Sequence, residues 1–346
     1  MGITQRQQVS KSTDIARFLG ASAIFYYHVG ILTGYPLSQW GEYAVTLFIV
    51  LAGIAYACFS SIQPADLRSY SRYFGHRLIA IFPTFVAVNC IIFAASYVYP
   101  SALNRPFTLA EFGLSSAGLS QYFDRRYLSV PMWFVPLILQ TYLVFPIIDN
   151  LTKRVSPVLI IVAAFLISLA LTSVVFWRWP SHGSEICRNW SVIFRLPEAC
   201  VAVIAGRWIL RRRDFQPGII AVVAFLLVSF LLAIISPRFP AEAYILSLPW
   251  HGALVTVVLL VPAICIGIFT SLPDSQLRLI GGSSFPFFLA HGTGILFVYH
   301  RFKAPIIPWI VYFALCWGGA ILFTFVFNCA QDLIRIRFLA STQPKN

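Results

Sequence analysis

The chain has 346 residues, of which 59% are apolar and only 11% are charged, and its formal net charge is +13. A soluble globular domain of this length has no use for so much apolar surface, so we predict an integral membrane protein. The basic residues are spread over short loops between apolar segments, which indicates anionic membrane lipids rather than nucleic acid as their partner. The seven cysteines are scattered singly, and no cluster of His, Cys, Asp or Glu has the spacing of a metal site, so we expect no metal.

Apolar segments of spanning length follow one another along the chain. The polar N-terminus runs directly into the first of them without a signal-peptide cleavage site, so we expect this helix to remain as an anchor. We predict ten transmembrane helices in an all-α bundle, which forms a single membrane domain over residues 1–346 without an appended soluble domain. The ten segments are residues 14–35, 42–62, 78–99, 130–150, 155–177, 190–210, 217–236, 249–271, 281–300 and 305–329.

The loops between these segments predict the orientation of the chain. An even number of spans places both termini on one side, and that side carries sixteen lysines and arginines against eight on the other. The positive-inside rule therefore predicts cytoplasmic termini, as in a protein of the bacterial inner membrane. The longest loop, residues 100–129, contains an amphipathic stretch from Phe107 to Phe123. This stretch fits either an interfacial helix over an outer groove or a plain surface loop.

The first apolar segment carries Arg17 and His28, which are costly to place in a membrane and are therefore candidates for function. In a helix they lie about 16 Å apart along the axis, so one reaches headgroup depth while the other lies near mid-membrane. A neutral imidazole is suited to take a proton from a hydroxyl near neutral pH, and Tyr27 is placed to orient the ring or a substrate. The alternative is a histidine that only forms hydrogen bonds within the bundle.

Six segments in chain order carry further landmarks. They are Arg17 to His28, Gly41 to Ser60, His76 to Phe85, Met132 to Ile148, Arg195 to Arg207 and Gly281 to Leu296. Together they resemble the acyltransferase-3 family of integral membrane O-acyltransferases, which move acetyl or other short acyl groups onto sugars. The resemblance extends over nearly the whole chain. Two positions depart from it, since Ala80 stands where many relatives carry an arginine and Ile138 where many carry a glutamate.

The resemblance implies a soluble acyl donor, acetyl-CoA or another short acyl-CoA, and no tightly bound cofactor. The phosphates of coenzyme A need cations at the cytoplasmic side, and arginine offers bidentate contacts to them. We expect Arg17, Arg72, His76 and Arg77 to meet there if the first and third helices are neighbours. The alternative for these residues is a positively charged membrane face without a ligand.

Other polar residues inside the apolar segments complete the candidate site. Arg195 and Glu198 stand three residues apart on one helix face, and they either form a structural ion pair or contact the acceptor. His291 and Trp133 carry family landmarks, and we assign them with Tyr27 to the edge of the site. Helix packing is the alternative for His291, and a place in the interfacial aromatic belt is the alternative for Trp133.

These observations predict transfer of an acetyl group to a hydroxyl of a glycan or lipid-linked glycan, with His28 as general base and Arg17 in the catalytic site. The transfer is either direct or through a transient covalent carrier. A secondary transporter or flippase of a glycan or small anionic substrate, with His28 and the Arg195 and Glu198 pair on its path, is the alternative from another class. The halves of the chain show no repeat that would favour it. A third alternative is a different family of histidine-dependent membrane acyltransferases that act on lipids or proteins, but its companion asparagine in a polar loop is not evident. A polysaccharide-synthesis complex and a second copy of the chain remain open as partners.

Overall fold

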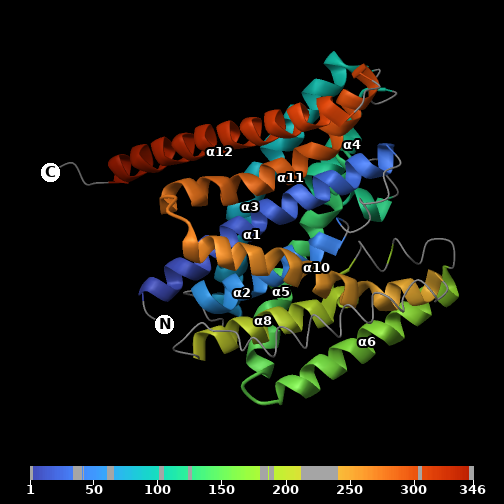
Figure 1. Cartoon of the computed structure of the whole chain (residues 1–346), viewed down its shortest axis with the longest axis vertical. Helices are drawn as coiled ribbons and strands as arrows, with labels where there is room; N and C mark the ends of the chain where they lie inside the picture. The colour runs from blue at the N-terminus through green and yellow to red at the C-terminus, as the bar shows by residue number, and fades with distance from the viewer. Residues whose placement is uncertain are drawn as a thin grey trace.

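The computed structural model describes residues 3–33, 41, 43–60, 66–100, 105–123, 127–179, 186, 191–211, 241–302 and 306–342. All secondary structure in these ranges is helical, which confirms the all-α prediction, and Figure 1 shows the long helices running alongside one another. The α-helices are α1 (Ile3–Thr33), α2 (Ala44–Phe59), α3 (Leu67–Val98), α4 (Leu109–Ser116), α5 (Phe134–Leu151), α6 (Pro157–Arg178), α8 (Leu196–Arg211), α10 (Ala241–Phe269), α11 (Asp274–Phe302) and α12 (Ile306–Thr342). Three short 3-10 helices are η3 (Ser120–Phe123), η4 (Val130–Trp133) and η5 (Val192–Arg195).

Nine of the ten predicted segments coincide with helices, and the other, residues 217–236, lies outside the described residues. Five helical stretches in the described part are long and apolar enough to cross a membrane, and α2 and Val255–Phe269 are shorter apolar helices. The five are Leu67–Val98, Val130–Leu151, Pro157–Arg178, Asp274–Leu296 and Ile310–Cys329. The chain is thus a multi-pass membrane protein, and the number ten remains a prediction.

Several helices extend beyond the apolar segments that predicted them. Helix α3 begins at Leu67 rather than at residue 78, because Asp66 caps it by accepting a hydrogen bond from the backbone N–H of Ser69 at 2.7 Å. The first turns of α3 are therefore polar and lie before its apolar part. Helices α1 and α12 likewise extend past their predicted bounds, to Ile3 and Thr342.

Helices α1, α2, α10 and α11 form the centre of the bundle. Helix α1 packs against the other three, and α2 also packs against α8. The backbones of α2 and α8 approach so closely that a Cβ added to Gly53 would lie 2.4 Å from the Cβ of Ala202. A Cβ on Gly206 would lie 2.6 Å from that of Ala57. Small residues on both sides of this contact allow the close packing that stabilises helices in a membrane.

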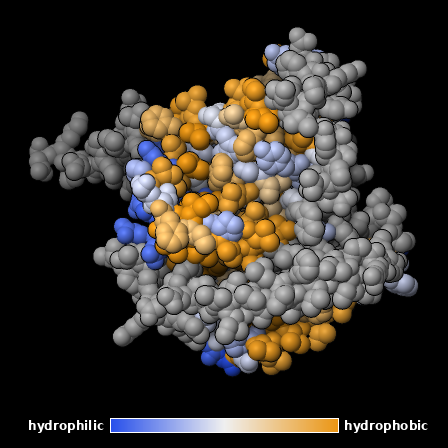
Figure 2. Space-filling view, in the orientation of Figure 1, coloured by the Kyte–Doolittle hydropathy of each residue, from blue (hydrophilic) through white to orange (hydrophobic). Residues whose placement is uncertain are grey.

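Helices α3, α6 and α12 lie at the periphery and expose apolar faces. Only 22%, 28% and 17% of their spanning windows are buried, against 61% for the window in α11. Figure 2 shows apolar residues over the middle of the visible face and hydrophilic residues toward the edge where α11 begins. An apolar belt bounded by polar ends is the surface that a lipid bilayer requires.

The two ends of the bundle differ. The beginning of α1 and the end of α12 lie at one end, and α4 lies at the other (Figure 1). Helix α4 forms within the first part of the amphipathic stretch of the longest loop, so this part is helical, and its place at the membrane interface remains a prediction. Glu111 accepts hydrogen bonds from the backbone N–H of Thr108 at 2.8 Å and from Arg105 at 2.6 Å. Burial raises the pKa of Glu111, but these hydrogen bonds outweigh burial and lower the pKa to about 2.

Candidate active site

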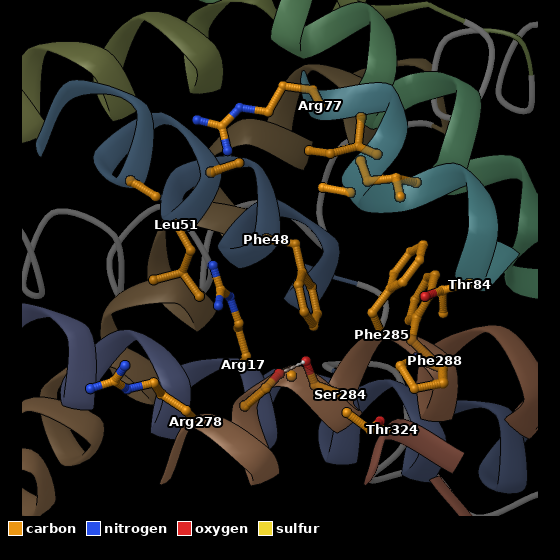
Figure 3. Close-up of a pocket in the computed structure, with 18 of the residues that line it drawn as sticks. Arg17, Phe48, Leu51, Arg77, Thr84, Arg278, Ser284, Phe285, Phe288 and Thr324 are labelled. Carbon is orange, nitrogen blue, oxygen red and sulfur yellow. Dashed lines mark hydrogen bonds between the residues drawn. The ribbon is translucent and has the colours of Figure 1, made fainter. Parts of the chain in front are cut away.

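A cavity of about 570 Å³ lies among α1, α2, α3, α5, α11 and α12. We call it the arginine cavity, because Arg17, Arg77 and Arg278 line it. Figure 3 shows Arg17 and Arg278 on one side of the view and Phe288 on the other, with Phe48 between them. The cavity therefore has a cationic part and an aromatic part.

Each arginine reaches the cavity from a different helix. Arg17 on α1 donates to the carboxylate of Asp14 at 3.2 Å. Asp14 packs so closely against Gly281 of α11 that a side chain at position 281 would collide with it. The guanidinium of Arg77 on α3 lies 5.4 Å from the ring centroid of Tyr73 and 5.2 Å from that of Tyr142. Cation–π contacts of this kind hold the guanidinium in place without neutralising its charge.

Arg278 was not among the residues selected from the sequence. It lies in the second turn of α11, exposed, three residues before Gly281. The signal that could have found it is its position just ahead of the Gly281 to Leu296 motif. Its side chain lines the same cavity as Arg17 and Arg77, which gives this cavity three arginines.

Of the other residues predicted to bind the acyl donor, one lines the arginine cavity and one does not. His76 lines the arginine cavity, whereas Arg72 is exposed on α3 and is not among its lining residues. Ala80 and Ile138, the two departures from the family pattern, both line it. The cavity wall is therefore apolar at both positions.

A layer of three phenylalanines bounds the aromatic part of the cavity. Phe48, Phe134 and Phe288 all line it, and their ring centroids lie 5.3 to 6.0 Å apart. The ring of Phe288 also lies 5.8 Å from that of His291. The aromatic layer thus contacts the cavity on one side and a histidine on the other.

His28 and His291 form a pair in the interior. Their ring centroids lie 5.1 Å apart, and the ring of Tyr27 lies 5.0 Å from that of His28. His28 is partly buried, and His291 is fully buried and stacks on Phe287. Two imidazoles placed side by side can accept and return a proton, although neither of them lines the arginine cavity.

The remaining predicted residues lie in other contacts. Arg195 and Glu198 form a buried ion pair at 2.9 Å, and Glu198 also accepts a hydrogen bond from Thr46 on α2 at 2.8 Å. This network joins η5 and α8 to α2, and none of its members lines the arginine cavity. Trp133 is partly buried at the end of η4, where its ring packs edge-on against Phe134.

A comparison with models of known protein families shows to which family the chain belongs. The family model of an acyltransferase domain matches residues 11–329. The chain belongs to the acyltransferase-3 family. The matched range includes the arginine cavity, the phenylalanine layer and the histidine pair, so all three are parts of this acyltransferase domain. Comparison with curated proteins and with solved structures gives no match.

Proposed function

We propose that this membrane acyltransferase moves an acetyl group from cytoplasmic acetyl-CoA to a hydroxyl of a glycan or lipid-linked glycan, such as an exopolysaccharide precursor. The observation that carries the proposal is the arginine cavity, whose aromatic part adjoins the His28 and His291 pair. Its volume of about 570 Å³ lies in the ordinary range for small-molecule and cofactor sites.

The cationic part of the cavity suits the phosphates of coenzyme A. Arg17, Arg77 and Arg278 come from three helices, so their donors approach a bound phosphate from different directions. Arginine is the side chain best suited to planar, bidentate contact with phosphate oxygens. Arg17 forms an ion pair with Asp14, and the charge of Arg278 also acts on that carboxylate, which leaves Arg77 as the strongest phosphate ligand of the three. Many relatives carry an arginine where this chain has Ala80, and here Arg278 supplies a cation to the same cavity.

The reacting end of the donor points toward the histidines. Phe288 lines the cavity and contacts His291, so the phenylalanine layer separates the cavity from the histidines, and in this proposal the acetyl thioester passes this layer to reach His28. The acceptor oxygen attacks the thioester carbonyl carbon while a ring nitrogen of His28 takes the hydroxyl proton. The new carbon–oxygen bond forms, the carbon–sulfur bond breaks, and the leaving thiolate takes the proton back from His28. His291 and Tyr27 position the ring of His28.

The proposed orientation places the arginine cavity on the cytoplasmic side of the inner membrane, together with both termini. The basic residues near the cavity favour this side: Arg278 is exposed near the start of α11, and Lys153 and Arg154 are exposed in the connection between α5 and α6. A cysteine at Arg154 should resist an impermeant thiol reagent applied from outside, whereas one at the exposed Leu109 of α4 should react. The opposite labelling pattern, corrected for the native cysteines, would reverse the orientation.

Binding and turnover of acetyl-CoA by the purified protein test the function. The wild type should bind acetyl-CoA saturably by calorimetry, and membranes containing it should release free CoA. Arg17→Ala should weaken binding, and His28→Ala should bind acetyl-CoA but release no CoA. Absence of saturable binding by folded protein would overturn the proposal and favour the transporter. CoA release by His28→Ala at the wild-type rate would remove His28 from the mechanism.

A further inference from the structure

A second cavity, of about 160 Å³, lies over α11 between α3 and α12. We call it the lateral crevice. Apart from His291, its lining consists of Val, Ile, Pro, Phe, Ala, Cys and Gly residues. A single water-sized sphere needs about 10–15 Å³ of such space, so the crevice has room for a chain of several atoms.

The lateral crevice opens on the side of the protein that faces lipid. Ile91 of α3 lines it and is 56% exposed, and Gly319 of α12 lines it from the opposite wall and is also exposed. Both helices are peripheral and pack on α11. An occupant of this crevice is therefore hydrocarbon, because nothing in its wall except His291 can form a strong hydrogen bond.

The inner end of the crevice reaches the pair of histidines, His28 and His291. His291 forms part of its wall, and the ring of His28 lies 5.1 Å beyond. Pro286 and Phe323 line both the lateral crevice and the arginine cavity, so the two spaces share a wall. An acyl group whose carbonyl carbon lies at the histidine pair has its alkyl end directed at this apolar space.

We propose that the lateral crevice binds the alkyl chain of the acyl group, so that the enzyme accepts linear acyl groups longer than acetyl, such as butanoyl and hexanoyl. The inference rests on the proposed function, since it assumes that the thioester reacts at His28. The acyl chain of the donor fits better than the tail of a bilayer lipid, because the proposed reaction holds the thioester carbonyl beside the imidazoles, and nothing holds the ester carbonyl of a lipid there. The buried imidazole of His291 forms the end wall of an otherwise apolar space, as this arrangement requires.

Two neighbouring glycines of α12 provide a matched test. Gly318 and Gly319 are both exposed, and a Cβ added to either meets no atom within 4 Å, but only Gly319 lines the crevice. Gly319→Leu therefore fills the crevice, while Gly318→Leu adds the same side chain to the same helix outside it. Ile91→Trp fills the crevice from the other wall, should Gly319→Leu fail to fold.

The experiment measures dissociation constants of acetyl-CoA, butanoyl-CoA and hexanoyl-CoA for the protein in lipid nanodiscs, with empty nanodiscs subtracted. In the wild type each added methylene should tighten binding about three- to fourfold until the crevice is full. Gly319→Leu or Ile91→Trp should abolish this gain, and Gly318→Leu should keep it. The ratio of two dissociation constants does not depend on how much of a variant is folded.

The outcomes separate the two proposals. If acetyl-CoA binds and chain length has no effect, or if Gly318→Leu and Gly319→Leu behave alike, the crevice does not bind the acyl chain and the proposed function stands. If no acyl-CoA binds to folded protein, the proposed function itself fails.

Discussion

The arginine cavity predicts that two arginines of the same helix differ sharply in their effect on the donor. Arg77 and Arg72 both lie near the polar start of α3, but only Arg77 lines the cavity, where Tyr73 and Tyr142 hold its guanidinium. A hydrogen bond to a charged group contributes about 1.5–3 kcal/mol, so Arg77→Ala should raise the KM for acetyl-CoA about 10- to 100-fold. The half-buried position of Arg77 favours the lower part of this range, because solvent screens the charge. The kcat should change little, since the phosphates lie far from the reacting carbonyl.

The assay follows free CoA with a thiol reagent in membranes that contain equal amounts of each variant. Arg72→Ala is the control, because it removes the same charge from the exposed surface of α3. An unchanged KM for Arg77→Ala would refute the assignment of the phosphates to this cavity. Equal increases for Arg77→Ala and Arg72→Ala would show that the basic membrane face, rather than the cavity, attracts the donor. An effect of Arg72→Ala alone would restore Arg72 to the donor site.

Three further predictions concern the other polar groups. His291→Ala should lower CoA release about 100-fold or more without loss of acetyl-CoA binding, and a normal rate would limit this residue to packing. Arg195→Met should destabilise the detergent-purified protein by about 3–5 kcal/mol, because it leaves the buried carboxylate of Glu198 without its cation. Adding Glu198→Leu should recover most of the loss. Stability of Arg195→Met equal to that of the wild type would contradict this. The pKa of Glu111 in the folded protein, about 2, lies below its ordinary value of 4.5, so its stabilising effect is complete above the ordinary pKa and is lost as the pH falls toward 2. Thermal unfolding measured from about pH 6 to about pH 3 should therefore show a larger loss of stability for the wild type than for Glu111→Gln, and parallel curves would refute the role of its bond to Arg105.

The helices were predictable because their signal is local. A run of apolar residues long enough to cross a bilayer has few alternatives to a helix, since its backbone must satisfy its own hydrogen bonds. The start of α3 was missed for a local reason as well, since the cap at Asp66 extends the helix into polar sequence that hydropathy does not mark. The interior of the membrane also limits which polar residues occur there, which is why Arg17, His28 and His291 stood out.

The sequence by itself therefore determined a helical membrane protein, its family, and most of the polar residues worth testing. Tertiary structure alone decided that Arg278 joins Arg17 and Arg77, that His291 lies against His28, and that Arg72 stays on the surface. It also decided that three phenylalanines meet between the arginine cavity and His291, and that an apolar crevice reaches the same histidine. The reason is that hydropathy reports the environment of each helix separately. Which faces of distant helices meet depends on the fit of side chains such as those around Gly53 and Gly281, and that fit exists only once the bundle has packed.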